Sequence, residues 1–204
     1  PTYSLVWANL AQVFSVTGQL DKAKKSFKNI LSMEPKNGLI WAEYGTVLTK
    51  LANYEEGRDA YLKALEFKPD SPRVHLSLGH VYKTMGEIDN SIDSYKNTIL
   101  QNNLSGEAYW SLANLKTYSF SENEIIDMEK TLKGDISDIE RSQMHFALGK
   151  AYEVKKDFDK SFKNYYEGNK LKKGLIKYSS DDTTDNTKRI LNFFNKENIQ
   201  KLAK

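Results

Sequence analysis

The chain lacks several features that would point to particular classes of protein. It has no cysteine among 204 residues, which excludes disulfides, a thiol nucleophile and thiolate metal sites and is compatible with a reducing cytoplasm. No apolar run approaches the ~18 residues of a membrane span. The 30 basic and 27 acidic residues are interspersed and give a net charge of only +3, which argues against a nucleic-acid partner. We therefore expect a cytoplasmic protein that binds neither membranes nor nucleic acids.

The sequence instead repeats with a period of 34 residues. The positions that share this spacing are Leu10, Tyr44, Leu78 and Leu112. Their surroundings repeat as well: Trp7-x-x-Leu10-Ala11-x-x-Phe14 recurs as Trp41-x-x-Tyr44-Gly45-x-x-Leu48 and as His75-x-x-Leu78-Gly79-x-x-Tyr82. A period of this length indicates stacked supersecondary units.

Each unit has the pattern of two amphipathic helices. In the first unit, Trp7, Leu10 and Phe14 follow the i, i+3, i+7 spacing of one helix face, Gly18 interrupts the pattern, and a second helix stops near Pro35. Small residues recur on the first helices, where they predict a close approach of the two helices of a hairpin: Ala11, Gly45, Gly79 and Ala113. Large residues recur on the second helices, where we expect them to fill the space between neighbouring hairpins: Phe27, Tyr61 and Tyr95.

Three helix starts carry capping signals. Ser71 precedes Pro72, which predicts a hydroxyl cap before a proline in the first turn. Ser121 and Ser137 are each followed three residues later by a glutamate, the spacing of a capping box.

These residues resemble the tetratricopeptide repeat family over three successive units that cover 4–105. The resemblance implies an all-α fold, a right-handed α-solenoid of antiparallel helix pairs with a concave groove. We expect about five hairpins followed by C-terminal helices. The predicted array spans 1–178, with units near 4–37, 38–71, 72–105, an irregular 106–141 and 142–175; a polar lead-in and one or two amphipathic helices fill 179–204. Pro1 lies six residues before Trp7, as Pro35 does before Trp41, so we expect further repeats upstream.

The irregular stretch carries a second resemblance. Residues 109–120, 145–152 and 165–171 are similar to segments of bacterial proteins that join tetratricopeptide repeats to a sulfotransferase domain. The resemblance implies a sulfotransferase domain downstream in the same polypeptide. That domain would open with a P-R-S-G-[ST]-T-like loop that binds the sulfonate donor, and no such loop occurs in this sequence. The chain is therefore predicted to be the non-catalytic repeat region of such a protein.

No catalytic constellation is visible in the sequence. His75 and His145 hold the tryptophan position of their repeats and are predicted to lie in the core, whereas His80 is predicted to face the groove, with no partner of known role. The chain has no spacing typical of metal ligands, no nucleophile motif and no glycine-rich phosphate loop. We therefore predict no catalytic residue, no metal and no cofactor.

The groove is the candidate site, and the family register places side chains of the first helices in it. The predicted groove residues are Asn9, Gln12, Thr46, Lys50, His80, Lys83, Trp110, Asn114, Tyr118 and Lys150, with Glu43 and Ser77 on the same face. Such hydrogen-bonding groups and lysines suit an extended peptide, since amides bind its backbone and lysines its carboxylates. A solvated face with ordinary charges is the alternative. For Trp110, packing against the 122–132 helix is favoured over stacking on a ligand.

Three functions stay open at this level. The first is a module that binds a peptide or protein segment in the groove. The second is a freestanding adaptor or an oligomerisation scaffold. The third is part of a catalytically active sulfotransferase. The Phe193–Phe194 pair either caps the last hairpin or docks a further domain.

Overall fold

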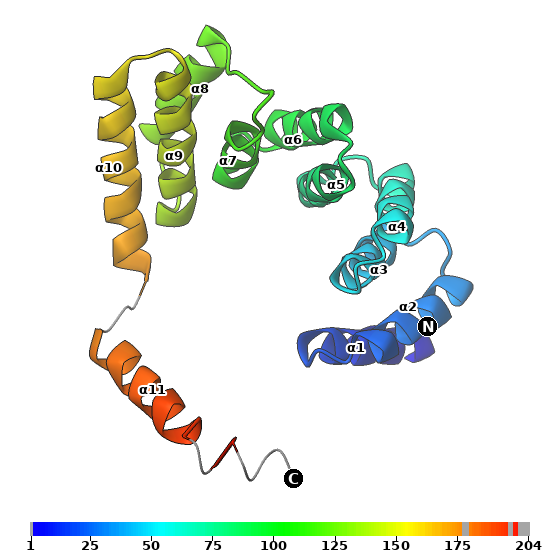
Figure 1. Ribbon diagram of the computed structural model, residues 1–204. Helices are drawn as coiled ribbons and strands as arrows, with labels where there is room; N and C mark the ends of the chain where they lie inside the picture. Colours follow the sequence, from blue (N-terminus) through cyan, green and yellow to red (C-terminus); the bar gives the residue numbers. More distant parts are fainter. Residues whose placement is uncertain (1, 177–179, 196–197, 200–204) are drawn as a thin grey trace.

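The computed structural model describes residues 2–176, 180–195 and 198–199 (Figure 1), so the predictions for Pro1 and for the last residues of the 179–204 segment lie outside the described residues. The described part contains eleven helices and no strand. They are α1 (Thr2–Val16), α2 (Leu20–Met33), α3 (Gly38–Lys50), α4 (Tyr54–Phe67), α5 (Pro72–Met85), α6 (Ile88–Gln101), α7 (Gly106–Ala113), α8 (Glu122–Leu132), α9 (Asp138–Val154), α10 (Phe158–Leu175) and α11 (Ser180–Phe193).

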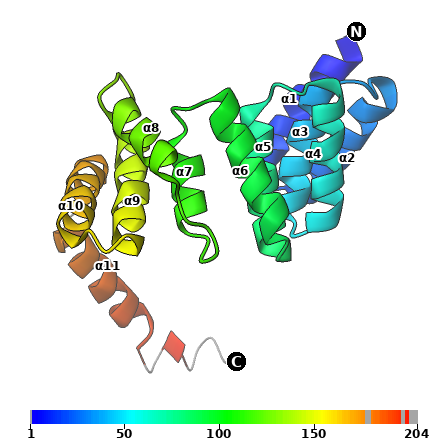
Figure 2. The same cartoon turned by 90° about the horizontal axis from the view of Figure 1, so that it is seen from above.

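Four pairs of consecutive helices pack together, α1 with α2, α3 with α4, α5 with α6 and α9 with α10, whereas α7 and α8 each pack against α9, and these elements stack into a curved array. The second helix of each of the first three pairs packs against the first helix of the next, α2 on α3, α4 on α5 and α6 on α7. Figure 1 shows α1, α3, α5, α7 and α9 along the inner side of an arc, with α2, α4, α6 and α10 outside, and Figure 2 shows the same stack from above. The predicted all-α solenoid is confirmed.

Glycine allows the two helices of a hairpin to approach closely, as predicted. A Cβ atom at Gly79 would lie 2.4 Å from the ring of Tyr95, and one at Gly45 would lie 2.9 Å from the ring of Tyr61. The tyrosine rings therefore occupy the space that a larger residue on the first helix would need. The same rings also reach the neighbouring hairpin, because Tyr61 and Tyr95 belong to clusters that include residues of α5 and α7.

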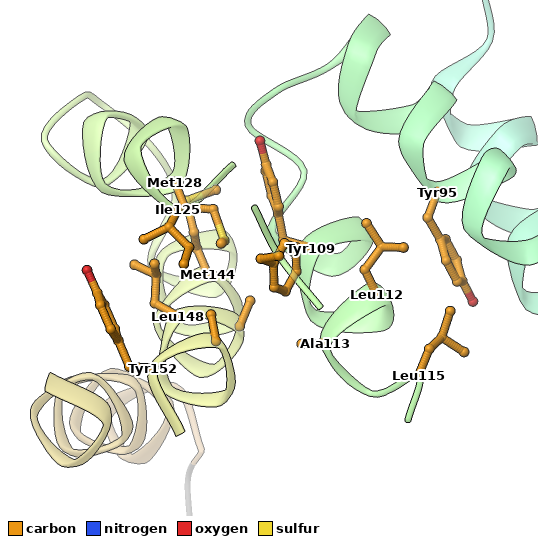
Figure 3. Close-up of a cluster of buried hydrophobic side chains, with 13 residues drawn as sticks. Tyr95, Tyr109, Leu112, Ala113, Leu115, Ile125, Met128, Met144, Leu148 and Tyr152 are labelled. Atoms are coloured by element: carbon orange, nitrogen blue, oxygen red, sulfur yellow. The ribbon is translucent and has the colours of Figure 1, made fainter. Parts of the chain in front are cut away.

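The largest buried cluster joins the third, fourth and fifth units. Figure 3 shows Leu112 and Tyr109 of α7 between Tyr95 of α6 on one side and Met128 and Met144 on the other. All five side chains are buried. The fourth unit, although irregular in sequence, is thus the centre of this core.

The fourth unit is irregular because its first helix is short and packs directly on α9. Helix α7 has only 8 residues. A Cβ atom at Gly106 would lie 2.3 Å from the backbone oxygen of Glu140, so the start of α7 touches the backbone of α9. The second helix, α8, spans Glu122–Leu132 as the sequence predicts.

Two of the three predicted caps form. The Ser121 hydroxyl accepts from the backbone N–H of Glu124, whose carboxylate accepts from the backbone N–H of Ser121, which completes a capping box. Ser137 accepts from the backbone N–H of Glu140. Ser71 holds the N-cap position before Pro72, but its side chain makes no cap hydrogen bond, so that prediction is wrong. Its φ and ψ angles of −140° and 80° differ from the φ −68°, ψ 164° of Ser121.

No helix within the described ranges is long and apolar enough to cross a membrane. Phe193 and Phe194 contact each other and are both exposed, so they do not cap the last hairpin.

Candidate peptide-binding groove

An apolar pocket of about 560 Å³ lies between α7, α9 and α10. Trp110 of α7 and Phe146 of α9 form one wall, with ring centroids 5.4 Å apart. Ile139, Leu175 and Ile176 add aliphatic surface, and all three are exposed. Aromatic and aliphatic walls of this kind suit a bulky apolar side chain.

The polar groups of this pocket are few. Lys172 of α10 places its Nζ atom 5.8 Å from the centre of the Phe146 ring. Gln143 of α9 also lines the pocket. Ser142 is already engaged, since its hydroxyl donates to the carbonyl oxygen of Gly168 at 2.8 Å. The hydroxyl of Tyr165, which also lines the pocket, donates to Glu153 at 2.9 Å, so the pocket offers one free amide and one cation beside its apolar walls.

A second hollow continues the first toward α5. It has a volume of about 470 Å³ and shares Ile139 and Gln143 with the apolar pocket. Leu76 lines it together with three charged residues, Arg73, Glu107 and Glu140. The two hollows together, hereafter the α5–α10 groove, run past the first helices of the third, fourth and fifth units and are also lined by the end of α6 and by α10.

His80 has two hydrogen-bond partners, neither of which the sequence predicts. Its Nδ1 atom lies 2.9 Å from the hydroxyl of Tyr95, and its Nε2 atom lies 3.3 Å from Oε1 of Glu107. Because a carboxylate only accepts, Nε2 of the neutral ring carries the proton and Nδ1 accepts from Tyr95. The hydrogen bond from His80 holds the pKa of Glu107 below its usual value, although partial burial opposes this.

The same arrangement recurs one period earlier. Thr46 holds the register position of His80, and its Oγ1 atom lies 3.1 Å from the hydroxyl of Tyr61. A tyrosine whose ring is buried keeps its hydroxyl near the surface, where the hydroxyl needs a partner. Thr46 and His80 therefore each bind the tyrosine hydroxyl of their own hairpin, a role that the sequence pattern did not predict.

The other predicted groove residues divide into two sets. Asn9, Gln12, Lys50, Lys83 and Asn114 are exposed. Lys150 is half-buried and pairs with Glu153 at 3.0 Å. Trp110 alone among the ten predicted residues lines the α5–α10 groove.

Tyr118 lies away from this groove. Its hydroxyl donates to the carboxylate of Glu124, and Nζ of Lys96 lies 5.2 Å from the centre of its ring. Lys96 and Glu124 belong to α6 and α8, both second helices of their units. Burial and the contact with Glu124 raise the pKa of Tyr118. Tyr118 thus joins the loop after α7 to two second helices, because the short α7 ends before it.

Trp110 packs on Phe146 of α9, a contact that was not predicted. The two remaining histidines also differ from the predictions. His75 and His145 are half-buried rather than core residues. Their position lies at the edge of the hairpin, where even Trp41 is half-buried and donates from Nε1 to the carbonyl oxygen of Pro35 at 2.8 Å. His145 places Nδ1 2.9 Å from Oδ1 of Asn164.

One groove residue that was not predicted, Phe146, could have been placed from the repeat register. Phe146 follows His145 as Trp110 follows Tyr109, and both continue the position of Leu76. The two extra residues of the fourth unit obscured this relation. Ile139 and Gln143 carry no pattern of their own, since only the direct contact of α7 with α9 brings them beside Trp110. Within the described residues, no group of three or more His, Asp or Glu could hold a metal ion.

Comparisons with known proteins agree with this architecture. Residues 5–37 match the sequence model of the tetratricopeptide repeat, and residues 45–86 match a second TPR repeat model. The predicted repeats are confirmed over these residues. None of the curated proteins matches the chain.

Several solved structures share the fold at low sequence identity. MamA aligns with a TM-score of 0.64 at 21% identity, over 82% of this chain and 97% of that one. MamA from Desulfovibrio magneticus RS-1 aligns with a TM-score of 0.64 at 17% identity, over 84% and 96%. YrrB, a TPR protein with an unusual peptide-binding site, aligns with a TM-score of 0.61 at 16% identity, over 81% and 84%. Identities this low establish the fold alone.

Proposed function

We propose that the chain is a non-catalytic protein-interaction module that binds an extended peptide or protein segment in the α5–α10 groove. The observation that carries this proposal is the half-buried Trp110–Phe146 pair, which forms the wall of an open apolar pocket at one end of that groove. The peptide-binding site of YrrB supports the proposal by analogy of fold.

The groove chemistry indicates what such a segment would contain. A bulky apolar side chain would fill the space between Trp110, Phe146 and Ile139, where it would be removed from water. The Gln143 amide would bind the peptide backbone, and the Lys172 ammonium would attract a nearby carboxylate. Arg73, Glu107 and Glu140 of the second hollow would contact the residues that follow this side chain in the bound peptide.

Selection from a displayed peptide library on the purified chain tests this function. We expect enriched peptides with a common bulky apolar residue. Truncation of a central aromatic contact typically costs about 2 kcal/mol, roughly thirtyfold in Kd. Trp110→Ala and Phe146→Ala should each weaken binding by this factor, whereas Tyr54→Ala should not, because Tyr54 lies at the start of α4 and outside the groove. Selected peptides that bind both groove variants as well as the wild type would contradict the proposal.

We also propose that this module is the repeat region of a sulfotransferase-linked protein. The support is the similarity of residues 109–120, 145–152 and 165–171 to segments of bacterial proteins that join tetratricopeptide repeats to a sulfotransferase domain. An assay of the purified chain for sulfonate transfer should give no turnover, and the encoding gene should contain a P-R-S-G-[ST]-T-like loop beyond Lys204. Turnover by the chain would favour the catalytic alternative, and a gene without the loop would favour a freestanding adaptor.

A further inference from the structure

The charged residues of the α5–α10 groove differ between its two ends. Among the described residues, the hollow beside α10 is lined by a single charged side chain, that of Lys172. The hollow beside α5 is lined by Arg73, Glu107 and Glu140, and the residues that the two hollows share are uncharged. Figure 1 shows α5, α7, α9 and α10 in succession along the arc, so the charges of one hollow are displaced along the groove from the charge of the other.

The α10 end of the groove is positive. Lys172 is exposed, and none of the ion pairs among the described residues includes it. Glu153 accepts a hydrogen bond from Tyr165 of this hollow, but Lys150 lies 3.0 Å from Glu153 and balances its charge. The Lys172 ammonium therefore has no carboxylate partner in the described part of the chain and is available to a carboxylate of a bound segment.

The α5 end is negative, although it contains an arginine. Arg73 places Nη2 3.5 Å from Oε1 of Glu43 on α3, so its charge is already balanced. Glu107 accepts from the neutral His80 ring, and this hydrogen bond lowers the pKa of Glu107, so the carboxylate is ionised at neutral pH. Glu140 accepts from a serine hydroxyl at 2.9 Å, which leaves its charge in place. Neither glutamate has a lysine or arginine partner among the described residues.

We propose that the α5–α10 groove selects segments in which a bulky apolar residue has an acidic residue on one side and a basic residue on the other. This inference rests on the proposed binding of a peptide in the groove. The acidic residue would pair with Lys172, and the basic residue would pair with Glu107 and Glu140. A segment with the same charge on both sides would bring like charges together at one end of the groove, which weakens its binding.

A displayed library with a fixed central phenylalanine and flanks drawn from glutamate, lysine and glutamine tests the charge preference on the purified chain. We expect the selected peptides to carry glutamate on one side and lysine on the other. Fluorescence anisotropy then compares labelled copies of them with peptides that carry glutamate on both sides or lysine on both sides. Each mismatched flank should weaken binding about two- to fivefold, the effect of an exposed ion pair. The difference should shrink at high salt, which screens such pairs.

Neutral variants of the chain show which charges are responsible. Lys172→Gln should abolish the preference for the acidic flank. Glu107→Gln keeps an oxygen that can accept from His80 but removes the charge, so it should reduce the preference for the basic flank. Lys163→Gln and Glu55→Gln are the matched controls, since both residues are exposed and lie outside the groove. These two substitutions should leave both preferences unchanged.

Binding to Trp110→Ala separates the charge preference from groove binding itself. Peptides that bind this variant more weakly than the wild type, but whose affinity does not depend on their flanks, would overturn the charge preference and leave groove binding intact. A flank preference that persists in both Lys172→Gln and Glu107→Gln would also overturn the inference, because the charges responsible would lie elsewhere. Phenylalanine peptides that bind Trp110→Ala as well as the wild type, or that fail to bind at all, would overturn both this inference and the proposed function.

Discussion

At the residue scale, single glycines on the first helices set the distance between paired helices. Gly45, Gly79 and Gly149 each face the ring of a tyrosine sixteen residues later, at separations that leave no room for a Cβ atom. The tyrosine hydroxyl then reaches the edge of the hairpin. At Tyr95 this hydroxyl binds His80, which explains why His80 is held in place rather than free in the groove.

Substitution of Gly79 measures this constraint. In Gly79→Ala the new methyl group would lie 2.4 Å from the ring of Tyr95, which is itself fully buried. We expect a loss of about 1–3 kcal/mol in the free energy of unfolding from overpacking. Gly174→Ala is the control, since nothing lies within 4 Å of its Cβ position, and it should be neutral or gain up to about 1 kcal/mol. Equal effects of the two substitutions in urea denaturation would refute the packing argument.

The second residue-scale prediction concerns His75 and pH. Burial lowers the pKa of His75, although a hydrogen bond to the carbonyl of Pro69 opposes the shift. Below the unfolded pKa of about 6.5, the unfolded chain therefore binds more protons than the folded chain. The contribution of His75 to the free energy of unfolding is therefore fully present above about pH 6.5. It is lost as the pH falls through the lowered pKa of the folded chain.

His75→Trp should remove this contribution. Trp41, one period earlier, donates to the carbonyl of Pro35, so an indole at residue 75 can donate to Pro69 in the same way. We expect the free energy of unfolding of the variant to vary less than that of the wild type between about pH 7 and about pH 5.5. If the free energy of unfolding, measured by urea denaturation, changes with pH equally in the wild type and in His75→Trp, then His75 is not the cause of the pH dependence.

At the scale of the element, the turn inside four of the hairpins repeats one backbone conformation. Gly18, Ala52, Gly86 and Lys156 hold equivalent positions and have φ angles of +76°, +60°, +82° and +63°. Only glycine adopts this region without strain, so the turns at Ala52 and Lys156 are strained. The sequence pattern marked Gly18 as the end of the first helix of its hairpin, whereas alanine and lysine gave no such signal at residues 52 and 156.

Ala52→Gly should therefore stabilise the protein. Relief of the left-handed strain raises the free energy of unfolding by about 1–2 kcal/mol. The larger conformational entropy of glycine in the unfolded chain lowers it by about 0.4–1 kcal/mol. A net rise of roughly 0.5–1 kcal/mol in the free energy of unfolding is expected. Gly86→Ala tests the opposite direction and should destabilise by a similar amount. A lower unfolding midpoint for Ala52→Gly would contradict the assignment of strain.

At the scale of the whole molecule, stability should be distributed along the stack. Each hairpin of a solenoid contacts only its neighbours, so a helix with a neighbour on each side is more protected than a terminal one. The core cluster of α6, α7 and α9 lies between other helices, whereas the described part of α11 has no buried residue. Hydrogen exchange should therefore be slowest in α6, α7 and α9, intermediate in α1 and fastest in α11. Strong protection of α11 would contradict this order.

The sequence by itself determined the solenoid, because its helical periodicity and 34-residue repeat arise from contacts within and between adjacent hairpins. Small residues such as Gly79 and capping residues such as Ser121 act over short sequence distances, and their roles were predictable. The α5–α10 groove was decided by tertiary structure. Gly106 lets the short α7 touch α9, which brings Trp110 onto Phe146, 36 residues later. Contacts across that distance depend on how whole helices pack, and the repeat pattern fails at the place where this packing changes.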